Sequence, residues 1–550
     1  MPLSTLTSYL KPKTSLLISI LLLATFLRFY HLSTNPPALY WDEASIGYNA
    51  FAILTRGIDE HGVHYPITNF LAYGDAKPPL YIYATSLSMA VFGVNEFAVR
   101  FPSALSGVIA VALTYFLVKN IFGKTKHSLA LAQISSLLLA ISPWHLQMSR
   151  AGFEANLALT LFLAGLLCFL RGLNRPKLLP ISAIFWIATL YTFNAYRIFL
   201  PFFLVLLLLL YCQRITRQLK WSLISAVVAM VLVAPLIPFV LSSQAQLRFD
   251  EVTIFKNQAP VIEANLRQQL NHNALWTKVI YNRRVLYALD FLKHYTDGFK
   301  PDFLFFSGDE NPRLSTRDQG EMYLIELPLV LIGLYQLLQL KDSKAKLLII
   351  GWLLLAFIPA GVARETPHAL RSLQVLPIPQ ILVGFGIIAL IDRFSNVKKY
   401  SQIGYWLLVI GYSLSLSLYL ETYYRHYPRY WSDSWQYGYK QLVSYIKDHQ
   451  DQYDRIYITQ KLGRPHTYVL FYLQYDPVKY VAERDAGGDP FGFTYTNSFG
   501  KYFFTNYDLS AKGDQKWLVV SGADAPPSEG QQLATISDPL GKPVFIITKM

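Results

Sequence analysis

The sequence predicts a mainly α-helical polytopic membrane bundle that is followed by a small α/β domain at the carboxyl end. Of the 550 residues, 53% are hydrophobic and only 15% are charged, which differs from the composition of a soluble domain. The apolar residues also gather in runs that are long enough to cross a bilayer. In the tail, by contrast, short strand-like runs alternate with a helical stretch.

A helix crosses the hydrocarbon with about 20 mostly apolar residues, and roughly 17 are sufficient. By this measure the chain contains about eleven spans. They lie near residues 14–31, 101–119, 128–144, 155–171, 178–195, 198–213, 221–241, 322–340, 346–363, 373–392 and 402–420. The first run follows Lys11 and Lys13, and no small-x-small cleavage site follows it. We therefore interpret it as an uncleaved first span with a cytoplasmic amino terminus.

The segment 79–93 is apolar but too short to span the membrane. If it lies along the membrane surface, the basic connections all fall on the cytoplasmic side, as the positive-inside rule requires. Their residues are Lys119, Lys124, Lys126, Arg171, Arg175, Lys177, Arg214, Arg217, Lys220, Lys341, Lys344, Lys346, Arg393, Lys398 and Lys399. This topology places the loops 32–100 and 242–321 outside the cytoplasm, together with the tail.

The tail is predicted to be a separate domain. Its strand-like runs are Arg455–Thr459, Trp517–Ser521 and Val544–Thr548, and Tyr439–Lys447 has a helical pattern. We therefore expect a membrane domain over residues 1–421 and an extracytoplasmic α/β domain over residues 422–550.

Several classes of protein are disfavoured. The net charge of +14 is spread in short clusters between apolar runs, so no basic groove for nucleic acid is expected. Two cysteines supply no disulfide framework, and no Gly-rich phosphate loop of the GxxxxGK type is present. His64, His145 and His368 lack the spacing of metal ligands. We expect no cofactor and no metal site, with a divalent metal as the less favoured alternative.

Two adjacent carboxylates, Asp42 and Glu43, follow the first span in the motif WDEA. Adjacent side chains point in different directions, so one of them is expected to face a reacting centre while the other makes a structural contact. We predict that Asp42 is catalytic, because a carboxylate partly desolvated by Tyr40 and Trp41 can take a proton from a hydroxyl or an amine. Glu43 remains a substrate-binding candidate. The alternative is that Asp42 caps a helix that begins near Glu43.

A second candidate group precedes the short surface segment, in the sequence DAKPPL. Proline suits the first turn of a helix, whose free backbone donors together with Lys77 form an anion site. Asp75 lies two residues before this lysine. The alternative is that Lys77 only extends its ammonium to the membrane interface.

The other candidates lie at the predicted extracytoplasmic ends of the spans. They are Arg100, Arg150, Glu154, Arg197, Arg364, His368 and Arg371. A single cation at such a position is commonly an interfacial anchor, but the outer face normally lacks an excess of arginine. Guanidinium groups bind phosphate oxygens in a bidentate manner, so we predict that this set binds the phosphate of a lipid headgroup.

In chain order, the motifs WDEA, KPPLYIY, VRFPSALSGVIAV, SRAGFEANLAL and YTFNAYRIFLP resemble those of polytopic GT-C glycosyltransferases. The likeness is to the family 39-like group, which is related to protein O-mannosyltransferases and lipid A aminoarabinose transferases, and it covers most of the membrane part. It implies that Asp42 is the base toward the acceptor and that transfer inverts the sugar. It also implies that Lys77 binds the lipid phosphate, with Arg100, Arg197 and Arg371 as further contacts, and that 79–93 is a surface helix.

The chain departs from this pattern at two places. The aminoarabinose transferases have a glutamate directly before the KPP lysine, whereas this chain has Ala76, so their metal site is not implied. The loop 242–321 is too short for the MIR domain of protein mannosyltransferases, so a eukaryotic-type protein substrate is not implied either. The segment FLFFSGDENPRLST in this loop contains Asp309 and Arg313, for which the sequence suggests no role.

The resemblance implies a glycosyltransferase of a bacterial plasma membrane. It would move a hexose or pentose from a polyprenyl-phosphate carrier to an extracytoplasmic protein, lipid or envelope glycan. The alternative is a transporter or flippase of a polyprenyl-linked lipid, although the sequence shows neither repeated halves nor polar residues near the bilayer midplane, and its charged residues concentrate at one rim. A third reading is an inactive relative that scaffolds envelope enzymes through its tail.

Overall fold

The computed structural model describes residues 14–394, 398–488, 494–508, 510 and 512–550, so Lys11 and Lys13 lie outside the described residues. The chain forms two compact units. The helical unit contains Met1–Arg28, Ser106–Ser149 and Glu154–Tyr419. The mixed unit contains Phe29–Leu105, Arg150–Phe153 and Leu420–Met550.

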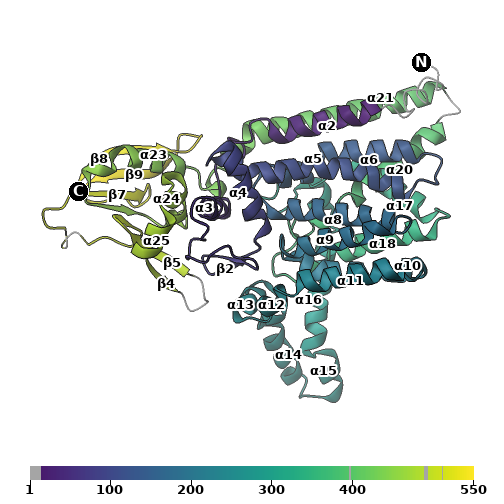
Figure 1. Ribbon diagram of the computed structural model, residues 1–550, viewed down its shortest axis with the longest axis horizontal. Helices are drawn as coiled ribbons and strands as arrows, with labels where there is room; N and C mark the ends of the chain where they lie inside the picture. Colours follow the sequence, from purple (N-terminus) through teal and green to yellow (C-terminus); the bar gives the residue numbers. More distant parts are fainter. Residues whose placement is uncertain (1–13, 395–397, 489–493, 509, 511) are drawn as a thin grey trace. The chain divides into compact units, whose positions relative to one another are not determined.

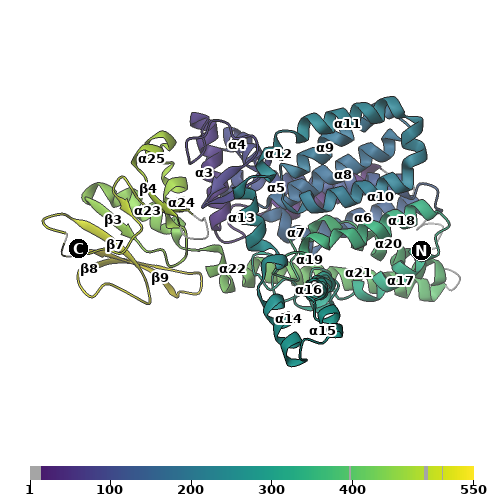
Figure 2. The same cartoon turned by 90° about the horizontal axis from the view of Figure 1, so that it is seen from below.

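The predicted spans all coincide with helices. Their bounds are α2 Thr14–Phe29, α5 Glu96–Ile121, α6 Ser128–Ile141, α7 Pro143–Arg150, α8 Glu154–Gly172, α9 Leu179–Leu190, α10 Ala195–Arg217, α11 Leu219–Val233, α12 Leu236–Val240, α17 Glu326–Leu338, α18 Ser343–Ala356, α19 Ile358–Gly361, α20 Ile378–Phe394 and α21 Lys398–Glu421. Helices α6 and α7 meet at a bend of 54°, where Pro143 cannot donate a backbone hydrogen bond. Helices α8 to α11 run alongside one another in the helical unit (Figure 1, Figure 2).

Much of the surface of the helical unit suits contact with lipid. Exposed apolar side chains, such as Phe202 and Leu209 on α10, Met230 on α11 and Leu407 on α21, suit a hydrocarbon surrounding, in which a helix satisfies its own backbone groups. Among the described residues, six helices are long and apolar enough to cross a membrane, or seven if α6 and α7 form one span. The chain is thus a multi-pass membrane protein, while the count of about eleven spans stays a prediction.

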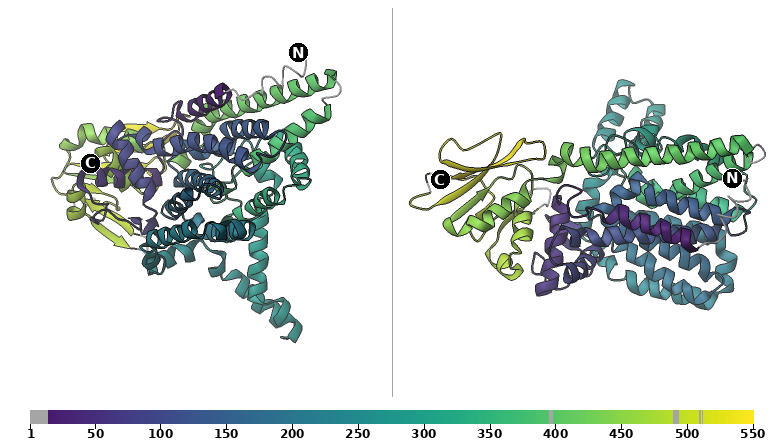
Figure 3. Two further views of the ribbon diagram at one scale, coloured as in Figure 1. Left: turned by 45° about the vertical axis from the view of Figure 1, so that its right-hand side comes forward. Right: turned by 90° about the horizontal axis from the view of Figure 1, so that it is seen from above.

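The loop 242–321 is largely helical, which the sequence analysis did not predict. It contains α13 Ser243–Val252, α14 Ala259–Leu270, α15 Leu275–Ile280, α16 Arg283–Asp297, the short 3-10 helix η2 Ile254–Lys256 and the π-helical turn η3 Asp302–Phe306. Helices α14 and α15 project from the rest of the helical unit (Figure 1, Figure 3).

The mixed unit joins the first predicted outer loop to the tail. The loop forms α3 Trp41–Arg56, the hairpin of β1 Phe70–Ala72 and β2 Asp75–Lys77, and α4 Leu80–Phe92. Helix α4 coincides with the predicted surface segment 79–93. Helix α24 of the tail, Pro465–Leu473, packs on α3, and Tyr468 on α24 donates a hydrogen bond to the carbonyl of Leu39 over 3.2 Å. The predicted division at residues 421 and 422 did not include this association.

The described residues of the tail form a seven-stranded sheet in the order β4-β5-β6-β3-β7-β9-β8. The three predicted strands are confirmed as β3 Arg455–Ile458, β7 Trp517–Gly522 and β9 Pro543–Lys549, and the helix as α23 Tyr439–His449. The sequence did not predict β4 Asp485–Gly488, β5 Thr494–Phe499, β6 Tyr502–Phe503, β8 Gln531–Ser537, α24 and α25 Pro477–Glu483. Strand β3 pairs in parallel with β6 and β7 at the centre of the sheet, where its residues are buried.

Glycines set the approach of α17 to α20 in the helical unit. A Cβ atom at Gly333 of α17 would overlap the carbonyl oxygen of Leu382, and one at Gly386 of α20 would overlap that of Leu329. Backbone therefore meets backbone at this crossing, as is common where small residues face each other in membranes.

We expect Gly333→Ala to destabilise the protein by about 1–3 kcal/mol, because the new methyl group must push two backbones apart. The measurement is the thermal unfolding midpoint of the purified chain in detergent. Gly404→Ala on α21 is the matched control, since a Cβ atom there meets nothing within 4 Å. Equal midpoints for the two variants would contradict the close crossing.

Candidate functional site

The WDEA motif forms the first turn of α3. The helix begins at Trp41, and Tyr40 is its N-cap residue with extended backbone. The amide of Tyr40 donates to Glu43 Oε2 over 3.2 Å. Asp42 is therefore the second residue of the helix, and the alternative that it caps a helix beginning near Glu43 is wrong.

Glu43 is completely buried and binds Arg100. The guanidinium donates from Nε to Glu43 Oε1 over 2.9 Å and from Nη2 to Oε2 over 3.1 Å. The amide of Gly152 also donates to Oε1 over 2.7 Å. A Cβ atom at Gly152 would lie 3.2 Å from Glu43 Cγ, so a larger residue there would press on the Glu43 side chain. Three motifs that are distant in the sequence thus meet at Glu43.

Two of the arginines predicted at the extracytoplasmic ends of the spans donate hydrogen bonds to the chain that leads into α3. Arg100 uses its other N–H groups on the carbonyls of Leu32, Pro36 and Ala38, so all five donors of this guanidinium are bound. Arg150 donates to the carbonyls of Tyr30 and Asn35 over 2.7 and 2.9 Å. The geometry favours a structural role for Arg100, Arg150 and Glu43 over the predicted direct contact with a headgroup.

Asp42, in contrast, is partly open and forms an ion pair. Lys77 Nζ lies 2.5 Å from Asp42 Oδ1 and 4.0 Å from Asp75 Oδ2. The Asp42 side chain is 28% exposed, whereas that of Lys77 is only 8% exposed. Asp75 and Lys77 are two residues apart on β2, so their side chains share one face of the strand. The structure brings these three predicted residues together.

Tyr73 is a neighbour that the sequence analysis missed. It stands with Gly74 in the turn between β1 and β2, and both have positive φ angles of 57° and 83°, as a tight hairpin turn requires. Its hydroxyl donates to the carbonyl of Trp41 over 2.6 Å. Burial raises the pKa of Tyr73, and the negative charge of Asp42 raises it further. Tyr73 therefore stays a neutral donor that ties the hairpin to the start of α3.

The remaining predicted residues belong to the helical unit. Glu154 is the first residue of α8 and is partly buried. Arg197 lies near the start of α10, where Nε donates to the carbonyl of Leu190 over 3.2 Å and the guanidinium lies 5.3 Å from the centre of the Phe239 ring. Arg197 Nη2 is buried and has no hydrogen-bond partner among the described residues. Arg364 donates to the carbonyls of Asp250 and Thr253.

His368 and Arg371 stand beside the segment that contains Asp309. Asp309 Oδ2 accepts from the amide of Ala369 over 2.6 Å and lies 4.0 Å from His368 Nδ1. Burial raises the pKa of Asp309 to about 6, and burial also lowers the pKa of His368 well below its ordinary value, with the charge of Arg371 adding to the effect. Arg371 Nη2 lies 4.0 Å from Glu365 Oε2. Asp309 thus connects its loop to the segment of residues 364–371.

The described part of the chain contains no group of three or more His, Cys, Asp and Glu residues that could hold a metal ion. His145 is bound by Arg28 Nη2 over 2.7 Å and by Asn156 Oδ1 over 3.1 Å. His64 is exposed at the surface of the mixed unit.

Comparison with known proteins agrees with this architecture. Residues 76–239 match the family model described as dolichyl-phosphate-mannose-protein mannosyltransferase. Two proteins of Bacillus subtilis (strain 168) are similar: "Putative mannosyltransferase YycA", 29% identical over 163 residues, and "Putative mannosyltransferase YkcB", 29% identical over 223 residues. These matches cover 30% and 40% of this chain but only 22% and 29% of the two relatives.

A solved structure shares the whole fold. The crystal structure of ArnT from Cupriavidus metallidurans bound to undecaprenyl phosphate superposes with a TM-score of 0.54 at 13% sequence identity, covering 97% of this chain and 98% of that one. The chain therefore has the GT-C-like polytopic fold that the sequence predicted.

The two adjacent carboxylates should differ in their effect on stability. We expect Glu43→Ala to cost about 3–5 kcal/mol, because it leaves Arg100 buried without its counter-charge. Asp42→Asn should cost less than about 1 kcal/mol, because the Asp42 ion pair is partly exposed to solvent. Thermal unfolding in detergent measures both. A greater loss in Asp42→Asn than in Glu43→Ala would refute this division of roles.

Proposed function

We propose that the protein is an inverting glycosyltransferase that moves a sugar from a polyprenyl-phosphate carrier to an extracytoplasmic acceptor. The observation that carries the proposal is the ion pair of Asp42 and Lys77, in which a half-open carboxylate and a nearly buried ammonium lie 2.5 Å apart. The match to a mannosyltransferase family model and the fold shared with a protein that binds undecaprenyl phosphate support it.

In this mechanism Asp42 removes the proton from the acceptor hydroxyl or amine. The acceptor atom attacks the anomeric carbon of the sugar as the bond from that carbon to the phosphate oxygen breaks. The proton remains on Asp42, and the lipid phosphate leaves with the electron pair of the broken bond. General-base assistance of this kind contributes about 10²–10⁴-fold to a rate.

Lys77 supports the departure of the phosphate. An ammonium has three donors, so Lys77 can keep Asp42 oriented while another N–H binds a phosphate oxygen. The charge on that oxygen grows as the bond breaks, so Lys77 stabilises the transition state more than the ground state. Asp75 keeps a second carboxylate near the ammonium and holds it in position.

Other cations of the helical unit remain candidate phosphate contacts. Arg197 is the most suitable, because its buried Nη2 has no hydrogen-bond partner among the described residues and a buried donor without a partner is costly. Glu154, Arg364, His368 and Arg371 stay substrate-binding candidates. We also propose that the membrane is the plasma membrane, with the amino terminus in the cytoplasm and the tail outside.

We expect Asp42→Asn to lower sugar transfer at least about 100-fold while lipid binding persists. The assay is transfer from radiolabelled polyprenyl-phosphate sugars to membrane extracts, in parallel with binding of undecaprenyl phosphate. Lys77→Met should weaken both transfer and lipid binding, because it removes the charge but keeps the length of the side chain. Asp448→Asn is the matched control, since Asp448 is an exposed carboxylate of the same unit.

Normal transfer by Asp42→Asn would remove this residue from the role of base. If neither the wild type nor any variant transfers sugar, and labelled lipid moves across vesicle membranes, the flippase is favoured instead.

A further inference from the structure

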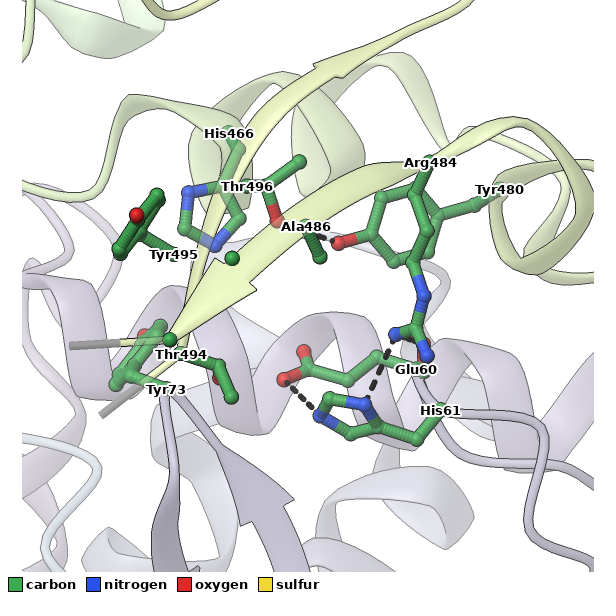
Figure 4. Close-up of a pocket in the computed structure, with 12 residues that line it drawn as sticks. Glu60, His61, Tyr73, His466, Tyr480, Arg484, Ala486, Thr494, Tyr495 and Thr496 are labelled. Atoms are coloured by element: carbon green, nitrogen blue, oxygen red, sulfur yellow. Dashed lines mark hydrogen bonds and ion pairs between the residues drawn. The ribbon is translucent and has the colours of Figure 1, made fainter. Parts of the chain in front are cut away.

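A cavity of about 230 Å³ lies within the mixed unit. Its lining residues come from the first outer loop and from the tail, and they include Glu60, His61, Tyr73, His466, Tyr480 and Arg484. Figure 4 shows these side chains around a central space, with Glu60 and His61 on one side and His466 on the other. We call this space the loop–tail cavity. It exceeds many times the roughly 30 Å³ that one water molecule occupies.

One side of the cavity is a fixed carboxylate. Glu60 Oε2 accepts a hydrogen bond from Asn49 Nδ2 over 3.1 Å, and Asn49 Oδ1 accepts from the amide of Glu60 over 3.0 Å. Asn49 belongs to α3 and is completely buried. Because the two residues hold each other at two points, the Glu60 carboxylate is oriented before any ligand arrives.

The proton of His61 can be placed. Arg484 Nη1 lies 2.9 Å from His61 Nδ1 and also donates to the carbonyl of Glu60 over 2.9 Å. Arginine only donates, so His61 Nδ1 is the acceptor and the proton is on Nε2. His61 Nε2 is buried without a hydrogen-bond partner among the described residues and lies 3.6 Å from Glu60 Oε1. The imidazole therefore stands beside the Glu60 carboxylate in the wall of the cavity.

The remaining walls are aromatic. The rings of Tyr73, Tyr480 and Tyr495 line the cavity with His466. Burial lowers the pKa of His466 to about 4, so this imidazole is neutral near pH 7. A Cβ atom at Gly487 would lie 2.6 Å from the Tyr495 ring, so glycine lets this ring lie close over β4.

This chemistry suits a sugar ring. The apolar C–H face of a pyranose packs on aromatic rings, and its neighbouring hydroxyls bind paired donors and acceptors. A phosphate is less suited, because the Arg484 guanidinium already binds Glu60 and His61 and a carboxylate faces the same space.

The cavity is coupled to the proposed reaction through Tyr73. Its ring lines the cavity, its hydroxyl donates to the carbonyl of Trp41 beside Asp42, and the charges of both Asp42 and Glu60 raise its pKa. Tyr73 also stands in the hairpin that carries Lys77. A ring bound in the cavity would therefore be held close to the proposed base.

We infer that the loop–tail cavity binds a neutral pyranose ring of the acceptor, so that the acceptor is a glycan or a glycoside. The inference rests on the proposed function, since it names the acceptor class of the same site. The donor sugar is a less suitable occupant, because it carries a phosphate and the Glu60 carboxylate faces the same space.

The test is binding of three methyl glycosides to the purified full chain by saturation-transfer NMR. The probes are methyl α-D-mannopyranoside, methyl β-D-glucopyranoside and methyl N-acetyl-β-D-glucosaminide. At least one should bind the wild type, and His61→Ala and Tyr495→Ala should bind it about tenfold more weakly, as expected for the loss of about 1.4 kcal/mol. Tyr495 is 43% exposed, so its replacement preserves the fold.

Two controls accompany these variants. Tyr430→Ala removes a tyrosine of the mixed unit that is 64% exposed and outside the lining set, and it should bind like the wild type. Binding of undecaprenyl-phosphate mannose by Tyr495→Ala should equal that of the wild type.

Failure of all three glycosides to bind the wild type would overturn the inference, as would equal affinity in Tyr495→Ala and Tyr430→Ala. Weaker binding of the lipid-linked sugar by Tyr495→Ala would assign the cavity to the donor and overturn the acceptor assignment. Glycoside binding needs no donor lipid. Binding without any transfer would therefore count against the proposed function alone.

Discussion

The buried ion pair of Glu43 and Arg100 organises the mixed unit. Arg100 binds the carboxylate and three carbonyls of the chain before α3, and Glu43 also receives the amides of Tyr40 and Gly152. Every donor of the guanidinium is used, so the cost of burying two charges is offset by hydrogen bonds. The pair fixes the first turn of α3 and, with it, the direction in which the neighbouring carboxylate points.

This arrangement explains why one of two adjacent carboxylates can be used for chemistry. A charge in a fully satisfied buried network cannot exchange a proton without leaving its partners exposed to the low dielectric. Asp42 lies one residue away on the solvent side, and its partner is a lysine on a separate hairpin. Lys77 is a compact charge with rotatable donors, so it can share its contacts between Asp42 and an incoming anion.

The sequence predicted those parts of the fold that depend on local composition. Apolar runs predicted helices such as α5, α8, α10 and α20, and β7 and β9 followed from their apolar residues. Strands such as β4, with the sequence DAGG, carry no such pattern, because their pairing depends on the neighbouring strand. Helices α14 to α16 were missed because each is shorter than a membrane span, and length was the measure used to find helices before the tail.

The candidate site was also predicted only where its residues stand in local sequence motifs. Asp42, Asp75 and Lys77, which the structure brings together, were predicted because they stand in short motifs beside predicted spans. Glu60 and Arg484 are 424 positions apart, and no local pattern relates them. Tyr73 was missed because its role depends on a left-handed turn that non-glycine residues rarely adopt. The β1–β2 hairpin carries Lys77 of the predicted ion pair on its second strand and Tyr73 of the cavity wall in its turn. It therefore connects the ion pair to a cavity whose lining residues are far apart in the sequence. The tail supplies part of this cavity, so the inferred acceptor site depends on residues from both ends of the mixed unit.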